Sequence, residues 1–270
     1  MAILTVSRQI ASLGDELCFS IAQKLNYRFV SRKDIEKRIL ELGFSEKKLR
    51  KFDEKKPGFF ASLSRDRDEY LDYLQTAMYE AALQDNCVII GRGSFIILKD
   101  LPNHISLKFV SEKNLRIQRY QDEHGCSKKY AEKIVNESDA NRKGFHKSFF
   151  NFDQNNPAMY HLVVNTGLIS SDAICDTIES LVKTTIKPED SQHGKEKLEE
   201  LLFAQQLSME FARAHNMEIR FLHTKIKENK IYLHGITDSN SKAAKAVEIA
   251  AAKFPDYEVC SSLTIDKDFK

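Results

Sequence analysis

The sequence lacks several features that would assign it to a class of protein at once. No apolar run approaches the ~20 residues that a membrane-spanning helix requires. The first residues, Met1 to Ser7, have neither the basic region nor the long apolar region of a secretory signal. The five cysteines are scattered without a CxxC pair, and the eight histidines contain no HExxH pattern. We therefore expect a cytoplasmic protein with neither a disulfide framework nor a zinc site of these types.

Neither glycine nor charge of one sign is abundant. Only 10 of the 270 residues are glycine, whereas a loop that cradles phosphate usually contains several glycines within a few positions. Lys and Arg number 41 against 39 Asp and Glu, a net charge of +2. This balance favours neither a nucleic-acid nor a membrane partner. With 42% hydrophobic and 30% charged residues, the chain has the composition of a globular protein.

Strands and helices alternate along the first two thirds of the chain. Continuous apolar runs such as Cys87–Ile90 are typical of strands buried on both faces of a parallel sheet. The predicted strands cover residues 2–6, 27–30, 87–90, 105–110 and 160–165. The predicted helices cover residues 15–25, 31–42, 64–84, 112–124, 127–143 and 171–182, with a break at Pro57–Gly58. Ser31 is the predicted N-cap of the second of these helices and Ser111 that of the fourth. This order predicts an α/β domain with a five-stranded parallel sheet and flanking helices, in which ligands bind at the carboxyl ends of the strands.

A polar stretch then separates this region from a smaller one. It predicts a linker over residues 185–196, between a domain of residues 1–184 and a second domain of residues 197–270. The second domain has the order helix, strand, strand, helix, strand, with apolar alternation from Met217 to Phe221. We predict a small α+β sandwich for it.

The turn after the first strand, Ser7 to Gly14, leads directly into a helix. Backbone N–H groups and the positive end of the helix dipole meet at such a turn, which makes it a natural anion site. A Walker A loop requires GxxxxGK[ST], however, and this turn has one glycine and no lysine. The alternative is an ordinary strand-to-helix connection.

A second candidate is Gly91-Arg92-Gly93, which follows the buried strand 87–90. The planar guanidinium of an arginine can bind two phosphate oxygens at once, and flanking glycines let the backbone come close to a ligand. The alternative is a tight turn with a solvated arginine.

Arginines on the later helices form a third candidate. Arg116 and Arg119 lie three residues apart on one helix face, and Asp139 and Arg142 repeat this spacing. Arginines that converge on a cleft neutralise the charge that develops on phosphoryl oxygens during transfer. The alternative is a solvated charged face, the usual fate of such pairs.

Taken in this order, the motifs resemble the cytidylate kinase-like family of P-loop nucleotide kinases, over residues 1–182. That family opens with a strand and a loop of the form Ser-Arg-Glu-Phe-Gly-Ser-Gly-Gly-Arg-Glu-Ile-Ala. It stands here as Ser7-Arg8-Gln9-Ile10-Ala11-Ser12-Leu13-Gly14-Asp15-Glu16-Leu17-Cys18. The further matches are Lys24-Leu25, Phe29 to Arg32, Phe52 to Pro57, Val88 to Gly93, Arg116 with Arg119, Asp139 with Arg142, and Tyr160 to Thr166.

The resemblance implies a P-loop kinase-like fold, ATP and Mg²⁺ as cofactors, and a CMP-like nucleoside monophosphate as substrate. The implied ATP-phosphate loop is Ala11, Ser12, Leu13, Gly14, Asp15 and Glu16. Arg92 is implied to hold the acceptor phosphate, and Asn165 with Thr166 to lie near the donor base. The implied lid arginines are Arg116, Arg119 and Arg142, with Asp139 orienting one of them or assisting Mg²⁺.

The chain also departs from the family pattern. Ala11 and Leu13 replace two family glycines, and a Cβ at either place can forbid a positive φ or keep the backbone from a phosphate. Gly14 stands where ordinary P-loop kinases have their lysine, and Asp15-Glu16 replaces the hydroxyl that holds Mg²⁺. Two hypotheses follow. The first is an ATP-dependent nucleotide kinase, and the alternative is a degenerate pseudo-kinase that acts as a binding or regulatory module.

The last 75 residues resemble a BON domain, through their element order and the run Lys230-Ile-Tyr-Leu-His-Gly235. That resemblance implies a small module that binds phospholipid or another ligand. We expect no signal peptide, and this segment has no net positive charge of its own, with 13 Lys and Arg against 14 Asp and Glu from residue 186 on. A module for interaction with a protein partner or for homo-oligomerisation is therefore the favoured interpretation.

Overall fold

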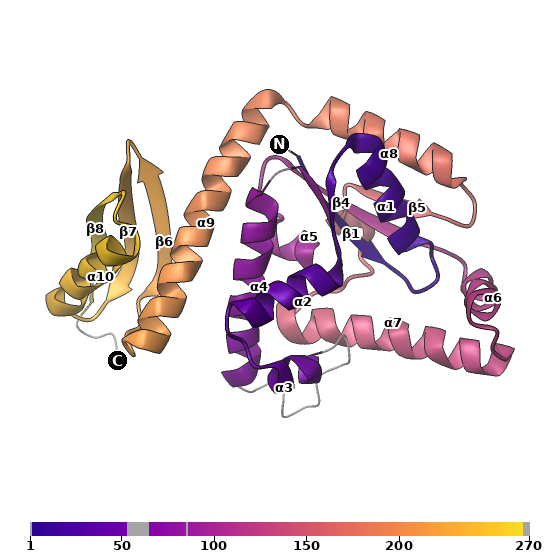
Figure 1. The fold of residues 1–270 in the computed structure, drawn as a ribbon, viewed down its shortest axis with the longest axis horizontal. Helices are drawn as coiled ribbons and strands as arrows, with labels where there is room; N and C mark the ends of the chain where they lie inside the picture. The colour runs from indigo at the N-terminus through magenta and orange to yellow at the C-terminus, as the bar shows by residue number, and fades with distance from the viewer. Residues whose placement is uncertain (1, 53–64, 85, 267–270) are drawn as a thin grey trace. The chain divides into compact units, whose positions relative to one another are not determined.

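Five short parallel strands form the centre of the first unit of the chain, which extends to Gly194. The computed structural model describes residues 2–52, 65–84 and 86–266. The strands are β1 (Ile3–Arg8), β2 (Arg28–Val30), β3 (Cys87–Ile90), β4 (His104–Val110) and β5 (Leu162–Asn165). They pair in the order β2-β3-β1-β4-β5, so the predicted five-stranded parallel sheet is confirmed (Figure 1).

Strand β1 lies in the middle of this sheet. Its register aligns Ile3 with Cys87 of β3 on one side and with His104 of β4 on the other. The chain passes from one half of the sheet to the other beside β1, and ligands of open parallel sheets bind at such a point, outside the carboxyl ends of the strands. The loops that follow β1, β3 and β4 therefore meet at one place.

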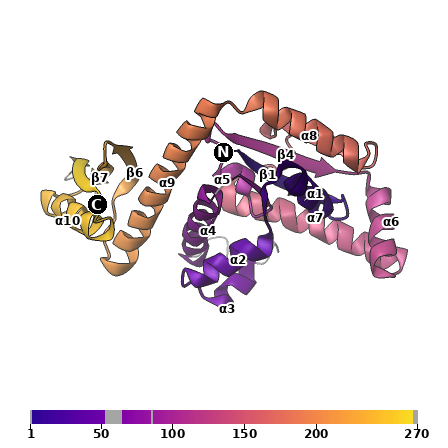
Figure 2. The ribbon, with the colours of Figure 1, turned by 45° about the horizontal axis from the view of Figure 1, so that its top comes forward.

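One face of the sheet packs against two helices. Helix α1 (Gly14–Leu25) and helix α8 (Ser171–Thr185) share an apolar core with the sheet residues that point toward them. Its fully buried members include Leu4, Val6, Leu107 and Phe109. Helices α4 (Arg65–Leu83) and α7 (Lys128–Phe150) lie on the opposite side (Figures 1 and 2). Helix spacing of apolar residues predicts both sets of helices.

The remaining elements of the first unit refine the predicted boundaries. They are α2 (Arg32–Glu41), α3 (Glu46–Leu49), the 3-10 turn η1 (Arg50–Phe52), α5 (Ser94–Ile97), α6 (Lys113–His124) and the 3-10 turn η3 (Pro157–Met159). Ser31 caps α2 as predicted, in a capping box with Asp34. For α6 the predicted cap Ser111 is wrong, because the Glu112 carboxylate accepts from Leu115 N–H at 3.0 Å. The predicted break at Pro57–Gly58 lies outside the described residues.

A helix occupies most of the segment for which a linker was predicted. Helix α9 runs from Pro188 to Ala214, and the Asp190 carboxylate accepts the Lys187 N–H at 2.9 Å before its first turn. Proline suits a first helical position because it has no N–H to satisfy. Gly194 does not break the helix. Its missing side chain makes room for Asn103, whose Oδ1 would lie 1.9 Å from a Cβ there.

The second unit, from Lys195, contains a three-stranded sheet. Strands β6 (Arg220–Lys227) and β7 (Lys230–Thr237) are antiparallel, and β8 (Glu258–Ile265) runs parallel to β7 after helix α10 (Asn240–Lys253). This small α+β unit is the one predicted. Its core includes Leu207, Phe211, Ile231 and Leu233.

The start of β6 differs from the predicted alternation. Phe221 has a φ of 54° and is 78% exposed, and the register with β7 shifts between Arg220 and His223. The extra residue of this bulge turns the Phe221 ring outward, which no apolar pattern reveals. Among the described residues, no helix has the length and apolarity needed to cross a membrane.

Candidate functional site

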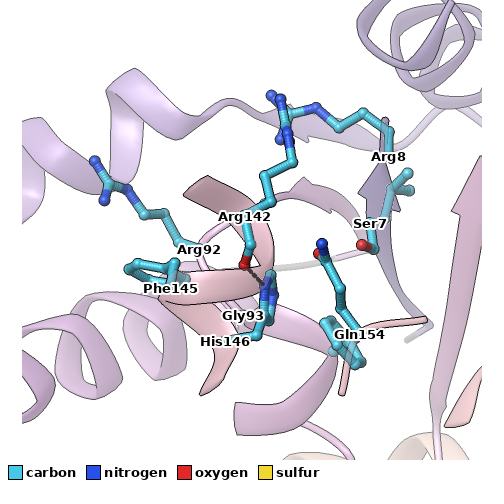
Figure 3. Close-up of a pocket in the computed structure, with 11 residues that line it drawn as sticks. Ser7, Arg8, Arg92, Gly93, Arg142, Phe145, His146 and Gln154 are labelled. Carbon is cyan, nitrogen blue, oxygen red and sulfur yellow. Dashed lines mark hydrogen bonds between the residues drawn. The ribbon is translucent and has the colours of Figure 1, made fainter. Parts of the chain in front are cut away.

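Two cavities adjoin each other at the carboxyl ends of β1, β3 and β4. Both are lined by Ser7, Arg8, Arg142 and Gln154. The first extends toward the turn after β3 and is further lined by Val6, Gly91, Arg92, Gly93, Phe95, Phe145 and His146 (Figure 3). The second extends toward β4 and is further lined by Gln9, Lys108, Asp139 and Asn155. They occupy the place that the parallel sheet predicts for a ligand.

Cations dominate the walls of the second cavity. Arg8, Lys108 and Arg142 line it, against one carboxylate, Asp139. Its volume is about 80 Å³, compared with about 20 Å³ for the first cavity, and one water requires roughly 10–15 Å³ on this scale. The second cavity therefore has room for several waters or for one anionic group of similar size. Guanidinium and ammonium groups are the donors that bind phosphate most strongly.

Arg8 is the last residue of β1 and lines both cavities. Its aliphatic stem crosses Gly14, where a Cβ would lie 2.5 Å from Arg8 Cγ and 2.7 Å from Arg8 Cβ. Its guanidinium lies 3.6 Å from the Asp15 carboxylate. The stem of Arg8 thus occupies the space that a side chain at position 14 would need. Ordinary P-loop kinases have their lysine at this position.

The turn between β1 and α1 keeps a left-handed backbone without glycine. Ala11 has a φ of 54° and Leu13 a φ of 57°, a region that costs roughly 1–2 kcal/mol for a residue with a Cβ. Buried Ser12 lies between them and donates to the Gln9 carbonyl at 2.9 Å and to the Phe109 carbonyl at 3.4 Å. These bonds, and the packing of Leu13 on the apolar core, hold the turn in this shape.

Arg119 of α6 connects this turn to the end of β5. It donates to the Thr166 carbonyl at 2.9 Å, to Thr166 Oγ1 at 3.3 Å and to the Ala11 carbonyl at 3.5 Å. Neighbouring Asn165 accepts the Gly167 N–H at 3.0 Å. The structure thus joins Arg119, an expected lid arginine, to Ala11 of the expected ATP-phosphate loop and to Thr166 of the expected donor-base side.

Arg116 instead joins α6 to α7. Its guanidinium makes a two-pronged contact with Asp139, at 3.0 and 2.9 Å, and its Nε donates to the Ser111 carbonyl at 3.2 Å. Arg116 is only 3% exposed, so the interpretation of this pair as a solvated charged face is wrong. Asp139 also lines the second cavity, and Arg116 therefore sets the position of the carboxylate there.

Arg92 occupies a turn in which three successive residues are left-handed. The φ angles are 80° at Gly91, 52° at Arg92 and 71° at Gly93. The side chain is buried, donates to the Phe52 carbonyl at 2.6 Å and pairs with the Glu36 carboxylate. Burial opposes ionisation of Glu36, but Arg92 and Arg32 together lower the pKa of its carboxyl.

The direction of Arg92 distinguishes it from the other two arginines. Its guanidinium points away from those of Arg8 and Arg142, which extend toward one another (Figure 3). The side chain is fully buried, so the interpretation of a solvated arginine is wrong. Arg142 also donates to Ser138 Oγ at 3.3 Å, one turn back along α7.

The sequence analysis missed several residues of this site, among them Phe145, His146 and Gln154, and the charged one is Lys108. It lies near the end of β4 and is 6% exposed. Its ammonium donates to the Gln154 carbonyl and to Asn155 Oδ1, the latter at 3.2 Å, and lies 5.3 Å from the Tyr160 ring centre. Burial lowers the pKa of Lys108, while Asp153 and Asp139 oppose this effect.

A sequence signal for Lys108 exists in β4. A strand buried on both faces of a parallel sheet is normally apolar throughout, but β4 alternates. Its polar residues His104, Ser106 and Lys108 are all buried, on the face opposite to Ile105, Leu107 and Phe109. His104 Nε2 lies 2.7 Å from Thr5 Oγ1, and Ser106 Oγ lies 2.9 Å from His161 Nδ1. Polar side chains at every second position of a buried strand thus indicate an internal polar face that ends at the cavity.

The side chains that line the second cavity fit a phosphate group together with Mg²⁺. Among the described residues, no group of three or more His, Cys, Asp or Glu forms a metal site. Mg²⁺ in phosphoryl-transfer sites usually takes one or two carboxylates, waters and the substrate phosphates. Asp139 is the carboxylate that the second cavity offers, and the three cations beside it match an anion.

Comparison with known proteins finds matches to the first unit of the chain. Residues 3–168 match the model of the cytidylate kinase-like family, and no curated protein matches the sequence. An uncharacterized protein from Eubacterium ventriosum has 19% identity and a TM-score of 0.55, covering 68% of this chain and 98% of its own.

Two named kinases are also among the similar structures. Shikimate kinase from Bacteroides thetaiotaomicron has 13% identity and a TM-score of 0.43, covering 67% of this chain and 98% of its own. A gluconokinase from Sinorhizobium meliloti has 11% identity and a TM-score of 0.42, covering 68% and 93%.

Proposed function

The chain belongs to the cytidylate kinase-like family, and we propose that its first unit transfers the γ-phosphoryl group of ATP to a nucleoside monophosphate such as CMP. The observation that carries this proposal is the second cavity. It places Arg8, Lys108 and Arg142 together at the carboxyl ends of β1 and β4, where a family member requires positive charge for phosphate.

The turn between β1 and α1 is the proposed donor-phosphate loop. Its backbone, from Ala11 to Glu16, retains two left-handed residues at the positions of the family's glycines, and α1 begins directly after it. Bound Mg·ATP supplies the transferable phosphoryl group and neutralises part of its charge. Thr166 and Asn165, held beside the loop through Arg119, form the proposed donor-base side.

Arginines have two different roles in this proposal. Arg8 and Arg142 bind the transferring phosphoryl group, because both line the cavity and their side chains extend toward one another (Figure 3). Arg116 and Arg119 are positioning residues, since they hold Asp139 and Thr166 respectively. Catalysis then rests on orientation and on electrostatic stabilisation rather than on a covalent intermediate.

Arg92 is assigned to the acceptor side of the site. Its turn lines the first cavity, and its guanidinium holds Glu36 of α2 and the Phe52 carbonyl next to that turn. The contacts favour a role in shaping the acceptor site. Direct contact with an acceptor phosphate requires the guanidinium to leave Glu36.

A specific observation supports the alternative of a pseudo-kinase. The Cβ atoms of Ala11 and Leu13 add bulk to the backbone of the proposed phosphate loop, where the family has glycines. Asp15 and Glu16 at the start of α1 are exposed acidic groups that repel ATP phosphates. In this alternative the fold binds nucleotide weakly or not at all, and the chain acts as a binding or regulatory module.

Thermal unfolding with ATP, ADP, CMP, UMP and dCMP, each with and without Mg²⁺, tests the two functions. A ligand present at about 100 times its Kd adds ~2.7 kcal/mol of stability, and at about 2–4 °C per kcal/mol in a protein of this size this raises Tm by roughly 5–10 °C. We expect a shift with Mg·ATP that grows when one monophosphate is added. ADP formation that depends on this monophosphate then establishes the activity.

The opposite outcome of this experiment is equally informative. If no nucleotide at millimolar concentration changes Tm, the kinase proposal fails and the pseudo-kinase alternative stands. If nucleotide binds but ADP never forms with any monophosphate, the site is a binding site only.

A further inference from the structure

We propose that Lys108 binds a phosphate group of the nucleotide in the second cavity and supplies the positive charge that a P-loop lysine supplies in other kinases. This inference rests on the proposed function, because it assigns a role within the same site. It adds a phosphate-binding residue on β4, a strand outside the P-loop.

The strand register places Lys108 at the P-loop. Lys108 pairs with Ser7 across the β1–β4 ladder, one residue before Arg8. Its side chain lines the second cavity together with Arg8 and Gln9 from β1 and Asp139 and Arg142 from α7. An anion in this cavity therefore meets cations from β1, β4 and α7.

Burial of an ammonium group is unfavourable unless its charge is matched. Lys108 is 6% exposed, and its described hydrogen-bond partners are two neutral oxygens, the Gln154 carbonyl and Asn155 Oδ1. An ammonium has three N–H donors, so one more acceptor can bind. Asp153 and Asp139 attract the ammonium from a distance, but neither is among its described hydrogen-bond partners. A phosphate oxygen in the cavity supplies both the further acceptor and a negative charge in direct contact with Lys108.

The cavity itself has too little negative charge to serve as the counterion of Lys108. Its carboxylate, Asp139, accepts both terminal N–H groups of Arg116, at 3.0 and 2.9 Å. Arg8 and Arg142 add two further positive charges to the wall. Like charges gathered around a small cavity favour a bound anion over an empty site.

The turn itself cannot hold the usual lysine. A Cβ at Gly14 would lie 2.5 Å from Arg8 Cγ, so a lysine at this position collides with the stem of Arg8. A lysine at position 14 would therefore displace Arg8, and Lys108 on the adjacent strand is placed to add a second positive charge beside that of Arg8.

Isothermal titration calorimetry on the full chain tests this role. Tripolyphosphate, Mg·ATP, CMP and the uncharged nucleosides adenosine and cytidine are titrated into the wild type, Lys108→Met, Lys108→Gln and Lys108→Arg. Lys143→Met is the matched control, because Lys143 is an exposed residue on α7. The Tm of each variant is measured alongside.

We expect Lys108→Met to weaken binding of tripolyphosphate and of at least one nucleotide by tenfold or more, and to leave nucleoside binding within threefold. Lys108→Arg retains most of the affinity because it keeps the charge, and Lys143→Met matches the wild type. Lys108→Gln keeps a donor for the Gln154 carbonyl, and the same comparison is made with this variant if Lys108→Met does not fold.

Two outcomes overturn the proposal in distinguishable ways. If the wild type binds nucleotides and the folded Lys108→Gln binds them and tripolyphosphate equally well, the role of Lys108 is wrong and the proposed function stands. An equal loss of nucleoside and phosphate binding likewise overturns it, because Lys108 then only supports the fold. If the wild type binds neither nucleotide nor tripolyphosphate, the proposed function fails, and the role of Lys108 fails with it.

Discussion

Two turns at the carboxyl edge of the central sheet adopt left-handed backbone conformations, but with different residues. The turn after β3 does so with glycines on both sides of Arg92, whereas the turn after β1 does so with Ala11 and Leu13. At Gly93 the glycine is required by packing, since a Cβ would lie 2.4 Å from Cε2 of Phe150. In the turn after β1, the hydrogen bonds of Ser12 and Arg119 hold the shape instead.

The difference shows that a left-handed turn can have two origins. Around Gly93, the neighbouring side chains leave no room for a Cβ. Around Ala11, the neighbours impose the conformation on residues that disfavour it, a strain that persists only where the surroundings over-determine it. The glycine signature of a phosphate loop can therefore disappear while the shape of the loop remains.

The largest effect is expected for Gly93→Ala. The new methyl group collides with Phe150 and occupies a φ of 71°, so we expect a loss of about 3 kcal/mol from overpacking and backbone strain together. Urea unfolding followed by circular dichroism measures it. Gly125→Ala separates the two causes, because its φ is 61° and nothing lies within 4 Å of the new Cβ. That control should lose only about 1 kcal/mol, and equal losses in both variants would show that packing at Gly93 is unimportant.

Next in size is Arg119→Met. This change removes the hydrogen bonds to Thr166 and Ala11, and bonds from a charged donor contribute about 1.5–3 kcal/mol. We expect a loss of about 2 kcal/mol and faster amide exchange in the turn after β1, with little change in the turn after β3. Lys133→Met, which removes only an exposed ion pair at 3.8 Å, should cost less than about 0.5 kcal/mol. Unchanged exchange near Ala11 would mean that Arg119 does not hold the turn.

Gly14→Ala is expected to act on binding more than on stability. Alanine favours the helix start by about 0.5–1 kcal/mol relative to glycine, but its Cβ displaces the stem of Arg8. We expect tripolyphosphate affinity to fall about tenfold, equivalent to ~1.4 kcal/mol, while the unfolding free energy changes by less than about 1 kcal/mol. Ser20→Ala, an exposed change on the same helix, is the control. If Gly14→Ala binds tripolyphosphate with wild-type affinity, Arg8 does not contribute to phosphate binding.

Sequence patterns predicted the sheet because its strands are short apolar runs separated by amphipathic helices. The cavity was predicted only as a location, at the carboxyl ends of the strands. Its chemistry depends on contacts between distant residues, such as that of Arg92 with Glu36, 56 positions apart. Arg92 shows the same pattern as a ligand-binding arginine, and no local pattern reveals that its guanidinium turns toward α2.

Two other differences between the predicted and the observed structure arise because a local sequence pattern can suit more than one structure. The polar residues at 185–196 indicate a linker, but polar residues also suit an exposed helix, and α9 covers most of them. Lys108 was overlooked because β4 contains enough apolar residues to be recognised as a strand, and its polar alternation was not interpreted. Buried polar side chains in a parallel strand were therefore the missed signal.

Ala11→Gly has the smallest expected effect, a change in the free energy of unfolding that urea unfolding measures. Glycine relieves a left-handed conformation that costs roughly 1–2 kcal/mol, but it also adds freedom to the unfolded chain, worth about 0.4–1 kcal/mol. We therefore expect a net stabilisation of about 0.5 kcal/mol.

The double variant Ala11→Gly with Leu13→Gly extends the test to binding. If the turn after β1 already has the shape of a phosphate loop, the double variant binds Mg·ATP within about threefold of the wild type, because the backbone that meets the phosphates is unchanged. Leu13→Gly alone controls for the lost packing of Leu13 on the core. If Mg·ATP binding appears only in the double variant, the side chains of Ala11 and Leu13 block the loop. The left-handed shape is then a remnant of a kinase site, because a loop with this backbone shape cannot bind a phosphate that its side chains keep out.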